Sequence, residues 1–143
     1  MILCPPRNLR PEKLEALRNV LDSAGFGHYE ITTPERHDEM IALTSQLPHV
    51  LSSAFIKAPL SQCHRGFSAG SFRDMTRVAY LNETMWTELF FENRENLLKE
   101  VSGLIGELSK YESALRDGDE AAMKELLREG RMKKESADGE VRR

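Results

Sequence analysis

The chain has 143 residues, enough to bury one hydrophobic core and too few for two complete domains. Hydrophobic residues make up 40% and charged residues 30%, as in ordinary globular proteins, and no apolar run approaches the ~20 residues that cross a bilayer. Because the net charge is −3, the chain has no overall basic surface, and we expect neither nucleic acid nor a membrane as a partner.

The N-terminal segment predicts a β-α-β unit. Residues 2–4 are apolar and end at two prolines, Pro11 then opens a helix that Gly25 closes, and residues 28–32 alternate as a strand. A unit of this size is the end of an open α/β sheet rather than a domain of its own.

A helix is predicted next, because apolar residues recur at helical spacing from Pro34 to Ala58. Pro48 lies inside it, and a proline within a helix removes one backbone donor and kinks the axis. We expect the kink to expose the polar side chains of Ser45, Gln46 and His49. Residues 59–69 hold Pro, Ser, Gln, His and Gly, which predicts a connection.

The second half of the chain predicts a long helix. Asn82 is placed as its N-cap, and apolar residues repeat every seven positions as far as Arg116, so this helix needs a partner surface. Residues 117–119 break it, and a last helix follows over residues 120–129. Residues 134–143 are predicted to be a charged, disordered tail.

Residues 70–79 carry two arginines, and Trp86 follows them. Arg73 and Arg77 are four positions apart, so on a helix both guanidinium groups leave one face. A guanidinium binds a carboxylate through two parallel hydrogen bonds, so this stretch predicts a pocket for a small carboxylate. The alternative from the residues alone is a pair of surface arginines bonded to neighbouring carboxylates.

Several short motifs occur in a fixed order along the chain: His37-Asp38, Ser45-Gln46-Leu47-Pro48-His49, GSFRDMTRVA at residues 70–79, Met85-Trp86 and Phe91-Glu92-Asn93. With these motifs, residues from about 1 to about 133 resemble the C-terminal helical domain of prephenate dehydrogenases, the NAD(P)-dependent enzymes of tyrosine biosynthesis. The resemblance implies a mainly α fold. Residues 34–133 would form the substrate-binding and dimerisation domain, and residues 1–33 the terminal β-α-β piece of a Rossmann-type nucleotide-binding domain.

The resemblance also implies a substrate-binding site. Arg77 falls on the arginine that binds the substrate carboxylate, and Arg73 falls on a supporting basic position. His49, Gly70 and Trp86 fall on positions that line the substrate pocket. From the residues alone, a lone histidine is more often capped or buried in the core, and a core position is as good an explanation for the tryptophan.

The chain contains no dinucleotide-binding fingerprint, since Gly25-Phe26-Gly27 lacks a third glycine and lies between a helix and a strand. In the family, the catalytic histidine and the NAD or NADP site belong to a preceding domain. We therefore expect no catalytic residue and no tight cofactor binding in this chain, which alone would not convert prephenate to 4-hydroxyphenylpyruvate. The resemblance implies a homodimer that takes prephenate or arogenate as its ligand.

Two other functions fit parts of the sequence. The long helix with its apolar seam fits an interaction module that has no ligand of its own. A helical enzyme of the chorismate mutase kind also binds such dicarboxylates with arginines, but its basic residues would be spread over several helices. Cys4 and Cys63 form no disulfide or zinc pattern, so we expect no metal site, and a reducing, cytoplasmic location fits.

Overall fold

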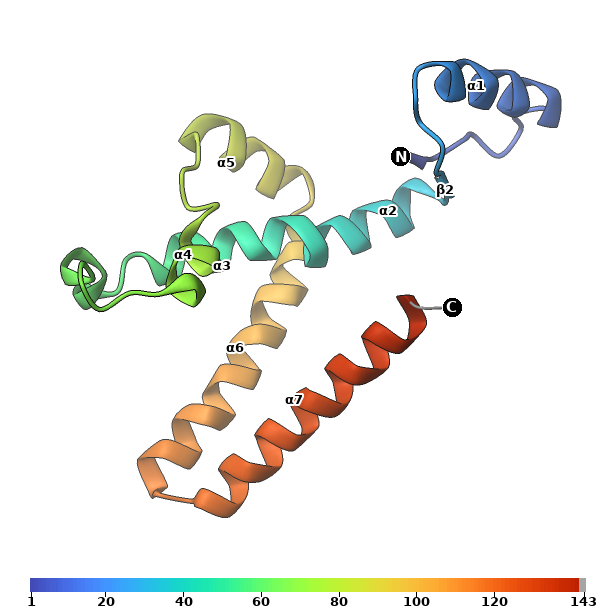
Figure 1. Cartoon of the computed structure of the whole chain (residues 1–143). Coiled ribbons are helices and arrows are strands. Elements are labelled where there is room, and N and C mark those ends of the chain that lie inside the picture. The colour runs from blue at the N-terminus through green and yellow to red at the C-terminus, as the bar shows by residue number, and fades with distance from the viewer. Residues whose placement is uncertain (142–143) are drawn as a thin grey trace. The chain divides into compact units, whose positions relative to one another are not determined.

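The computed structural model describes residues 1–141, which are mostly helical, and the prediction of a mainly α fold is confirmed (Figure 1). The chain divides into two compact units, one of residues 1–100 and one that begins at residue 101. The first unit contains the β-α-β piece, the proline-containing helix and the arginine segment. Among the described helices, none combines the length and apolar character that a bilayer crossing requires.

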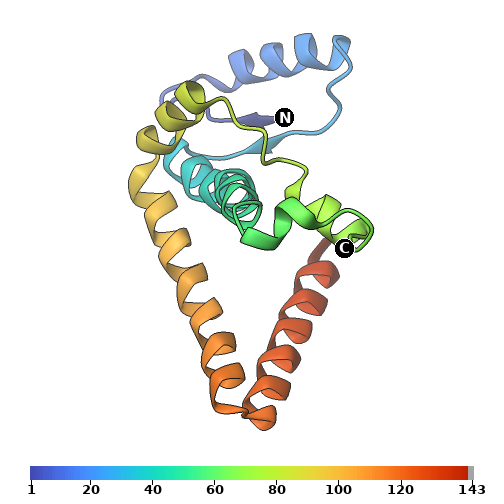
Figure 2. The same ribbon diagram turned by 90° about the vertical axis from the view of Figure 1, so that its left-hand side faces the viewer.

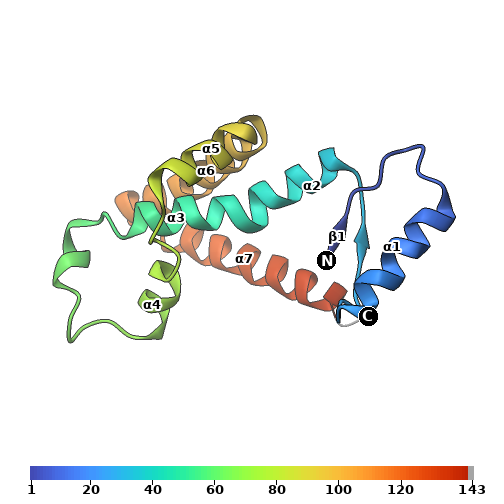
Figure 3. The same ribbon diagram turned by 90° about the horizontal axis from the view of Figure 1, so that it is seen from above.

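The N-terminal piece has the predicted β-α-β order. Strand β1 (Ile2–Leu3) pairs in parallel with β2 (Glu30–Ile31), and α1 (Pro11–Ser23) connects them (Figure 3). Proline at the first helical position suits α1, because its missing N–H would have had no partner there. After α1, the Tyr29 hydroxyl donates a hydrogen bond of 2.6 Å to Asp22, and burial together with this carboxylate raises the pKa of Tyr29 to about 12.

The central helix runs from Pro34 to Phe55 in three parts: α2 (Pro34–Ile41), a π-helical turn η1 (Ala42–Gln46) and α3 (Leu47–Phe55). Thr33 caps α2 by accepting a hydrogen bond from the Arg36 N–H at 3.2 Å. The structure has a π-helical turn just before Pro48 in place of the predicted kink at the proline itself. There the Leu47 N–H donates to the Ala42 carbonyl, one residue further back than in an α-helix.

Short elements follow the central helix. A 3-10 turn η2 (Pro59–Cys63) leads to α4 (Gly70–Thr76), which packs against α3, and then to α5 (Glu83–Glu92). Asn82 caps α5 as predicted, since its side chain accepts a hydrogen bond of 2.9 Å from the Met85 N–H. The predicted single helix over residues 82–116 is wrong, because Asn93 leaves helical geometry (φ −113°, ψ 31°) and separates α5 from α6 (Arg94–Asp117).

The last helix, α7 (Glu120–Val141), follows a turn in which Gly118 has a φ of 65°. The structure continues this helix through residues 134–141, where the sequence predicted a disordered tail; residues 142–143 lie outside the described chain. Ion pairs one turn apart hold the extension in helical form, among them Arg131 with Glu135 (2.7 Å) and Lys134 with Asp138 (2.5 Å). From the turn, the two arms of this hairpin diverge (Figures 1 and 2).

Few side chains are buried. Among the described residues, the buried hydrophobic ones are Ala42, Leu97 and Ala114. Helix α6 instead exposes a series of large apolar side chains, at fractions between 53% and 72%: Leu98, Ile105, Leu108 and Leu115. An apolar surface of this extent is typical of a protein that packs against another protein surface.

Candidate functional site

His49 and Trp86 lie against each other. The imidazole and indole rings are stacked with their centroids 4.1 Å apart and their planes 29° apart, and the indole also contacts the Phe90 ring at 5.3 Å. His49 lies in the first turn of α3, immediately after Pro48, and Trp86 lies in α5. The structure therefore brings together two of the predicted site residues that are far apart in sequence.

The hydrogen bond of His49 defines its tautomer. Its Nδ1 lies 2.7 Å from the carbonyl oxygen of Ser45, one turn earlier in the helix. A carbonyl oxygen can only accept, so Nδ1 carries the proton and donates it. In the neutral ring, Nε2 is then left as a hydrogen-bond acceptor.

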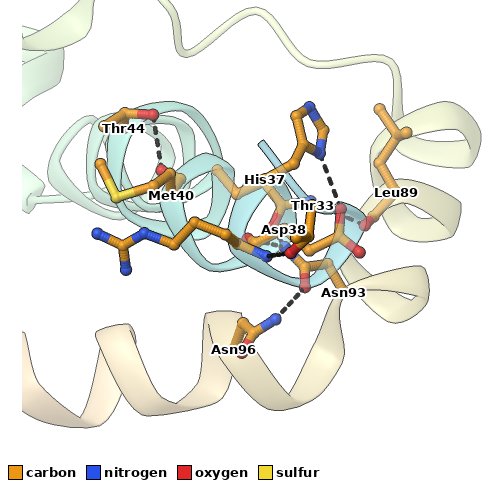
Figure 4. A network of polar contacts seen from close by, with 10 residues as sticks. Thr33, His37, Asp38, Met40, Thr44, Leu89, Asn93 and Asn96 are labelled. Atoms are coloured by element: carbon orange, nitrogen blue, oxygen red, sulfur yellow. Dashed lines mark hydrogen bonds and ion pairs between the residues drawn. The ribbon is translucent and has the colours of Figure 1, made fainter. Parts of the chain in front are cut away.

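The predicted kink would expose Gln46 to solvent, but the structure buries this side chain, which is 6% exposed. Its Nε2 donates to the Leu89 carbonyl at 2.9 Å, and its Oε1 accepts from Asn93 Nδ2 at 3.0 Å. Asn93 Nδ2 also donates to the Asp38 carbonyl at 2.8 Å, and Asn96 donates to Asn93 Oδ1 at 2.8 Å (Figure 4). The side-chain amides thus join the central helix to the junction of α5 and α6.

The two arginines lie at the end of a short helix. Arg73 is inside α4, whereas Arg77 follows the last residue of α4 with its backbone still helical (φ −55°, ψ −37°). Both are exposed, and within residues 1–141 neither forms an ion pair. The alternative in which neighbouring carboxylates neutralise them is therefore not observed, and both guanidinium groups are available to an anion.

Gly70 is the first residue of α4 and has an ordinary backbone conformation. A Cβ atom added to it would meet nothing within 4 Å, so nothing in the described chain itself requires glycine there. The space beside Gly70 is open.

Arg73 lines a pocket of about 470 Å³ together with His64, Thr76 and Tyr80. A more apolar pocket of about 560 Å³ adjoins it, and His64 lines both. The His64 ring stacks on Phe72 at 4.6 Å. Arg77, His49 and Trp86 line neither pocket, so the structure associates Arg73 with His64 rather than with the His49 and Trp86 stack.

The sequence pattern predicts no role for His64. The structure places it directly after η2, where its Nδ1 lies 2.9 Å from the Ser68 hydroxyl. Residues 64–68 form a turn and not a helix, so no regular spacing indicates this contact. Among the described residues, no group of three or more histidine, cysteine, aspartate or glutamate side chains could hold a metal ion. Cys4 and Cys63 are both exposed and unpaired.

Fold and site together define a helical domain. Its helix α6 exposes apolar side chains, and its first unit, residues 1–100, holds the imidazole–indole stack and the two arginines without an ion-pair partner among the described residues. Comparison with known families identifies it. Residues 33–129 match the family described as "Prephenate dehydrogenase, dimerization domain", and the chain belongs to this family. The resemblance inferred from the motifs is confirmed.

Two curated relatives illustrate the similarity. The chain is 33% identical over 128 residues to cyclohexadienyl dehydrogenase of Zymomonas mobilis, covering 83% of this chain and 43% of that protein. It is 27% identical over 123 residues to prephenate dehydrogenase of Bacillus subtilis, covering 82% of this chain and 33% of that protein. The chain thus spans less than half the length of these relatives.

Solved structures show the same fold. The Synechocystis arogenate dehydrogenase has a TM-score of 0.76 at 24% identity, with 95% of this chain and 51% of that chain covered. A prephenate dehydrogenase from Aquifex aeolicus, in complex with hydroxyphenyl propionate and NAD+, has a TM-score of 0.72 at 28% identity, with 95% and 49% covered. The match to these structures extends beyond the family region to include the N-terminal β-α-β piece.

Proposed function

We propose that this chain is the helical part of a prephenate or arogenate dehydrogenase, in which it binds the substrate carboxylate and forms a homodimer. The observation that carries the proposal is the unpaired guanidinium of Arg77, in the part of the chain that matches the family. A planar guanidinium without an internal carboxylate partner is suited to bind a carboxylate through two parallel hydrogen bonds.

In the reaction, a hydride leaves the ring carbon that carries the substrate hydroxyl, the ring carboxylate leaves as carbon dioxide, and the ring becomes aromatic. NAD or NADP, held by a nucleotide-binding domain, supplies the hydride acceptor. The described chain contributes binding and orientation. In this proposal, Arg77 holds a carboxylate and Arg73 adds positive charge four positions earlier, close to the open space beside Gly70. Trp86, which lies outside the pocket that Arg73 lines, forms an apolar wall with His49.

His49 takes part through its free ring nitrogen. Because Nδ1–H is bonded to the Ser45 carbonyl, neutral His49 accepts a hydrogen bond from a substrate hydroxyl at Nε2, and only the protonated ring donates one there. The stack on Trp86 restricts the plane in which Nε2 points. His49 is thus an orienting group in this proposal.

The same chain supplies the dimer contact. Large apolar side chains along α6, including Leu108 at 53% exposure and Leu115 at 72%, have no covering surface within the described chain. A second copy would offer an equivalent apolar surface, and two-fold pairing of identical chains is the commonest assembly. The prephenate or arogenate site and the dimer therefore belong to different parts of the chain.

Prephenate binding to the 143-residue chain, measured by calorimetry, tests the ligand part. Arg77→Ala removes a charge-assisted contact and should weaken binding by about 2–5 kcal/mol, a loss that Arg77→Lys should recover only in small part. Arg73→Ala should weaken binding less than Arg77→Ala. The control, Arg10→Ala, changes an arginine in front of α1 and should bind as the unchanged chain does.

Two results would contradict the proposal. One is a chain that binds no prephenate at all, and the other is binding that persists unchanged in Arg77→Ala. If either occurs while the chain still dimerises, the interaction module without its own ligand becomes the better description. A helical enzyme of the chorismate mutase kind would instead convert chorismate to prephenate, which the same preparation can be assayed for directly.

A further inference from the structure

Helix α5 contacts the central helix at two successive levels. At one level, Trp86 of α5 stacks on His49. One turn away, the Leu89 carbonyl of α5 accepts a hydrogen bond from Gln46 at 2.9 Å. Gln46 and His49 are three residues apart on one helix, and Leu89 and Trp86 are three residues apart on the other in the reverse order. The two contacts therefore follow one another along helix segments that run antiparallel.

At the contact of Gln46, both polar atoms of the side-chain amide are hydrogen-bonded. Gln46 is 6% exposed, its Nε2 donates to Leu89 and its Oε1 accepts from Asn93. Asn93 in turn donates to the Asp38 carbonyl and accepts from Asn96. A buried amide with both ends bonded resists displacement, because moving it leaves polar groups without partners.

The Trp86 level has no such bond. In the described chain, Trp86 contacts His49 and Phe90 through ring faces, and ring contacts permit sliding that hydrogen bonds of fixed length and direction do not. The relative position of indole and imidazole must therefore be set by neighbouring groups. Gln46 links the same two helices by hydrogen bonds, to the Leu89 carbonyl of α5 and to Asn93 at the end of α5.

We propose that Gln46 and Asn93 are positioning residues that hold α5 so that Trp86 stays stacked on His49. The positioning role itself does not depend on the proposed function. Only its consequence rests on that function: by keeping the stack in place, Gln46 and Asn93 maintain the shape of the wall of the prephenate site. Neither residue is placed in contact with ligand. Their effect is transmitted through the backbone of α5, by the Leu89 carbonyl on one side and the start of α6 on the other.

Trp86 is the only tryptophan of the chain, so the near-ultraviolet circular dichroism of the indole reports the surroundings of this one ring. An indole held in one orientation against a second ring gives a defined band, which weakens when the ring is free to turn. We expect the full chain to show this indole band at constant pH. His49→Leu should reduce the band, which assigns it to the stack.

The decisive variant is Gln46→Met, which keeps the length of the side chain and removes both hydrogen bonds. It should lose most of the indole band while its far-ultraviolet circular dichroism spectrum keeps its helical form. The matched control is Gln62→Met at an exposed position, which should keep the full band. Should Gln46→Met fail to fold, Asn93→Ala, at a partly exposed position, removes the bond to Gln46 together with the bonds to the Asp38 carbonyl and to Asn96, and should reduce the band.

An undiminished indole band in folded Gln46→Met, or in Asn93→Ala, overturns the proposal, as does a band of the unchanged chain that does not depend on His49. Prephenate affinity separates this proposal from the proposed function. Gln46→Met should weaken binding by a smaller factor than Arg77→Ala. If Arg77→Ala has no effect on binding while the indole band follows Gln46, the proposed function fails and the positioning role stands.

Discussion

The His49 imidazole stacks on the Trp86 indole with ring centroids 4.1 Å apart. The hydrogen bond from His49 Nδ1 to the Ser45 carbonyl places the proton on Nδ1 and restricts the rotation of the ring. One ring comes from the first turn of α3, next to Pro48, and the other from α5, which begins after an asparagine cap. The stack therefore links the central helix to α5 as well as shaping a candidate ligand wall.

The stack should contribute a measurable coupling energy. In a double-mutant cycle with His49→Ala and Trp86→Ala, we expect thermal or denaturant unfolding to give a coupling of about 0.5–1.5 kcal/mol, since stacked rings favour each other beyond the area they bury. A parallel cycle with His28→Ala in place of His49→Ala should give no coupling, because His28 makes no ring contact with Trp86 in the structure. Equal values in the two cycles would contradict the assignment.

Dimerisation should depend on the apolar face of α6. Sedimentation of the chain at micromolar concentration should give the mass of a dimer, and Leu108→Asp should give a monomer, because burying an unpaired carboxylate in an apolar contact is costly. The control is Val20→Asp on α1, where a 65% exposed valine receives the same charge and the dimer should persist. An unchanged mass in Leu108→Asp would exclude this face.

Ser52 offers a test of stability. It is 2% exposed, and its hydroxyl has no hydrogen-bond partner among the described residues. Ser52→Ala removes the unsatisfied group, so we expect the free energy of unfolding to rise by about 1 kcal/mol. Ser102→Ala, on the exposed side of a helix, measures the gain that alanine brings through helix propensity alone, and a Ser52 effect no larger than that control would contradict the prediction.

Tyr29 should titrate late. Its pKa of about 12 lies above the ordinary value of about 10, because burial and the Asp22 carboxylate disfavour the phenolate. With the folded pKa raised, the contribution of this contact is complete below about pH 10 and is lost as the pH rises through about 12. Ultraviolet titration of phenolate should show a late component that Tyr29→Phe removes; a titration curve identical in the two proteins would refute it.

Local sequence signals predicted those parts of the fold that local physics decides. Proline and glycine set the ends of α1, Asn82 capped α5, and Gly118 with its positive φ ended α6. Each of these depends on one residue and its immediate neighbours. The extension of α7 is also local: a charged composition predicts a solvated tail, whereas in the structure these charges pair at helical spacing.

The break between α5 and α6 could not be predicted in this way. Asn93 leaves the helix because its side chain is held by the Asp38 carbonyl, which lies 55 positions earlier in the chain. The same holds for the candidate site. The motifs indicate the candidate residues, whereas the stacking of His49 on Trp86, and the pocket that Arg73 and His64 line together, depend on how separate segments pack.

The π-helical turn at residues 42–46 amounts to one extra residue in an α-helix, and it changes the angular phase of everything after it. In an unbroken α-helix, Asp38 and Gln46 would point about 80° apart around the axis, whereas with the extra residue they differ by only about 20°. With both residues on nearly the same side of the helix, Asn93 bonds the backbone carbonyl of Asp38 and the side chain of Gln46 at once. A single-residue deletion in this turn would turn the two halves of the central helix against each other by about 100°, so the length of this segment is constrained even where its side chains are not.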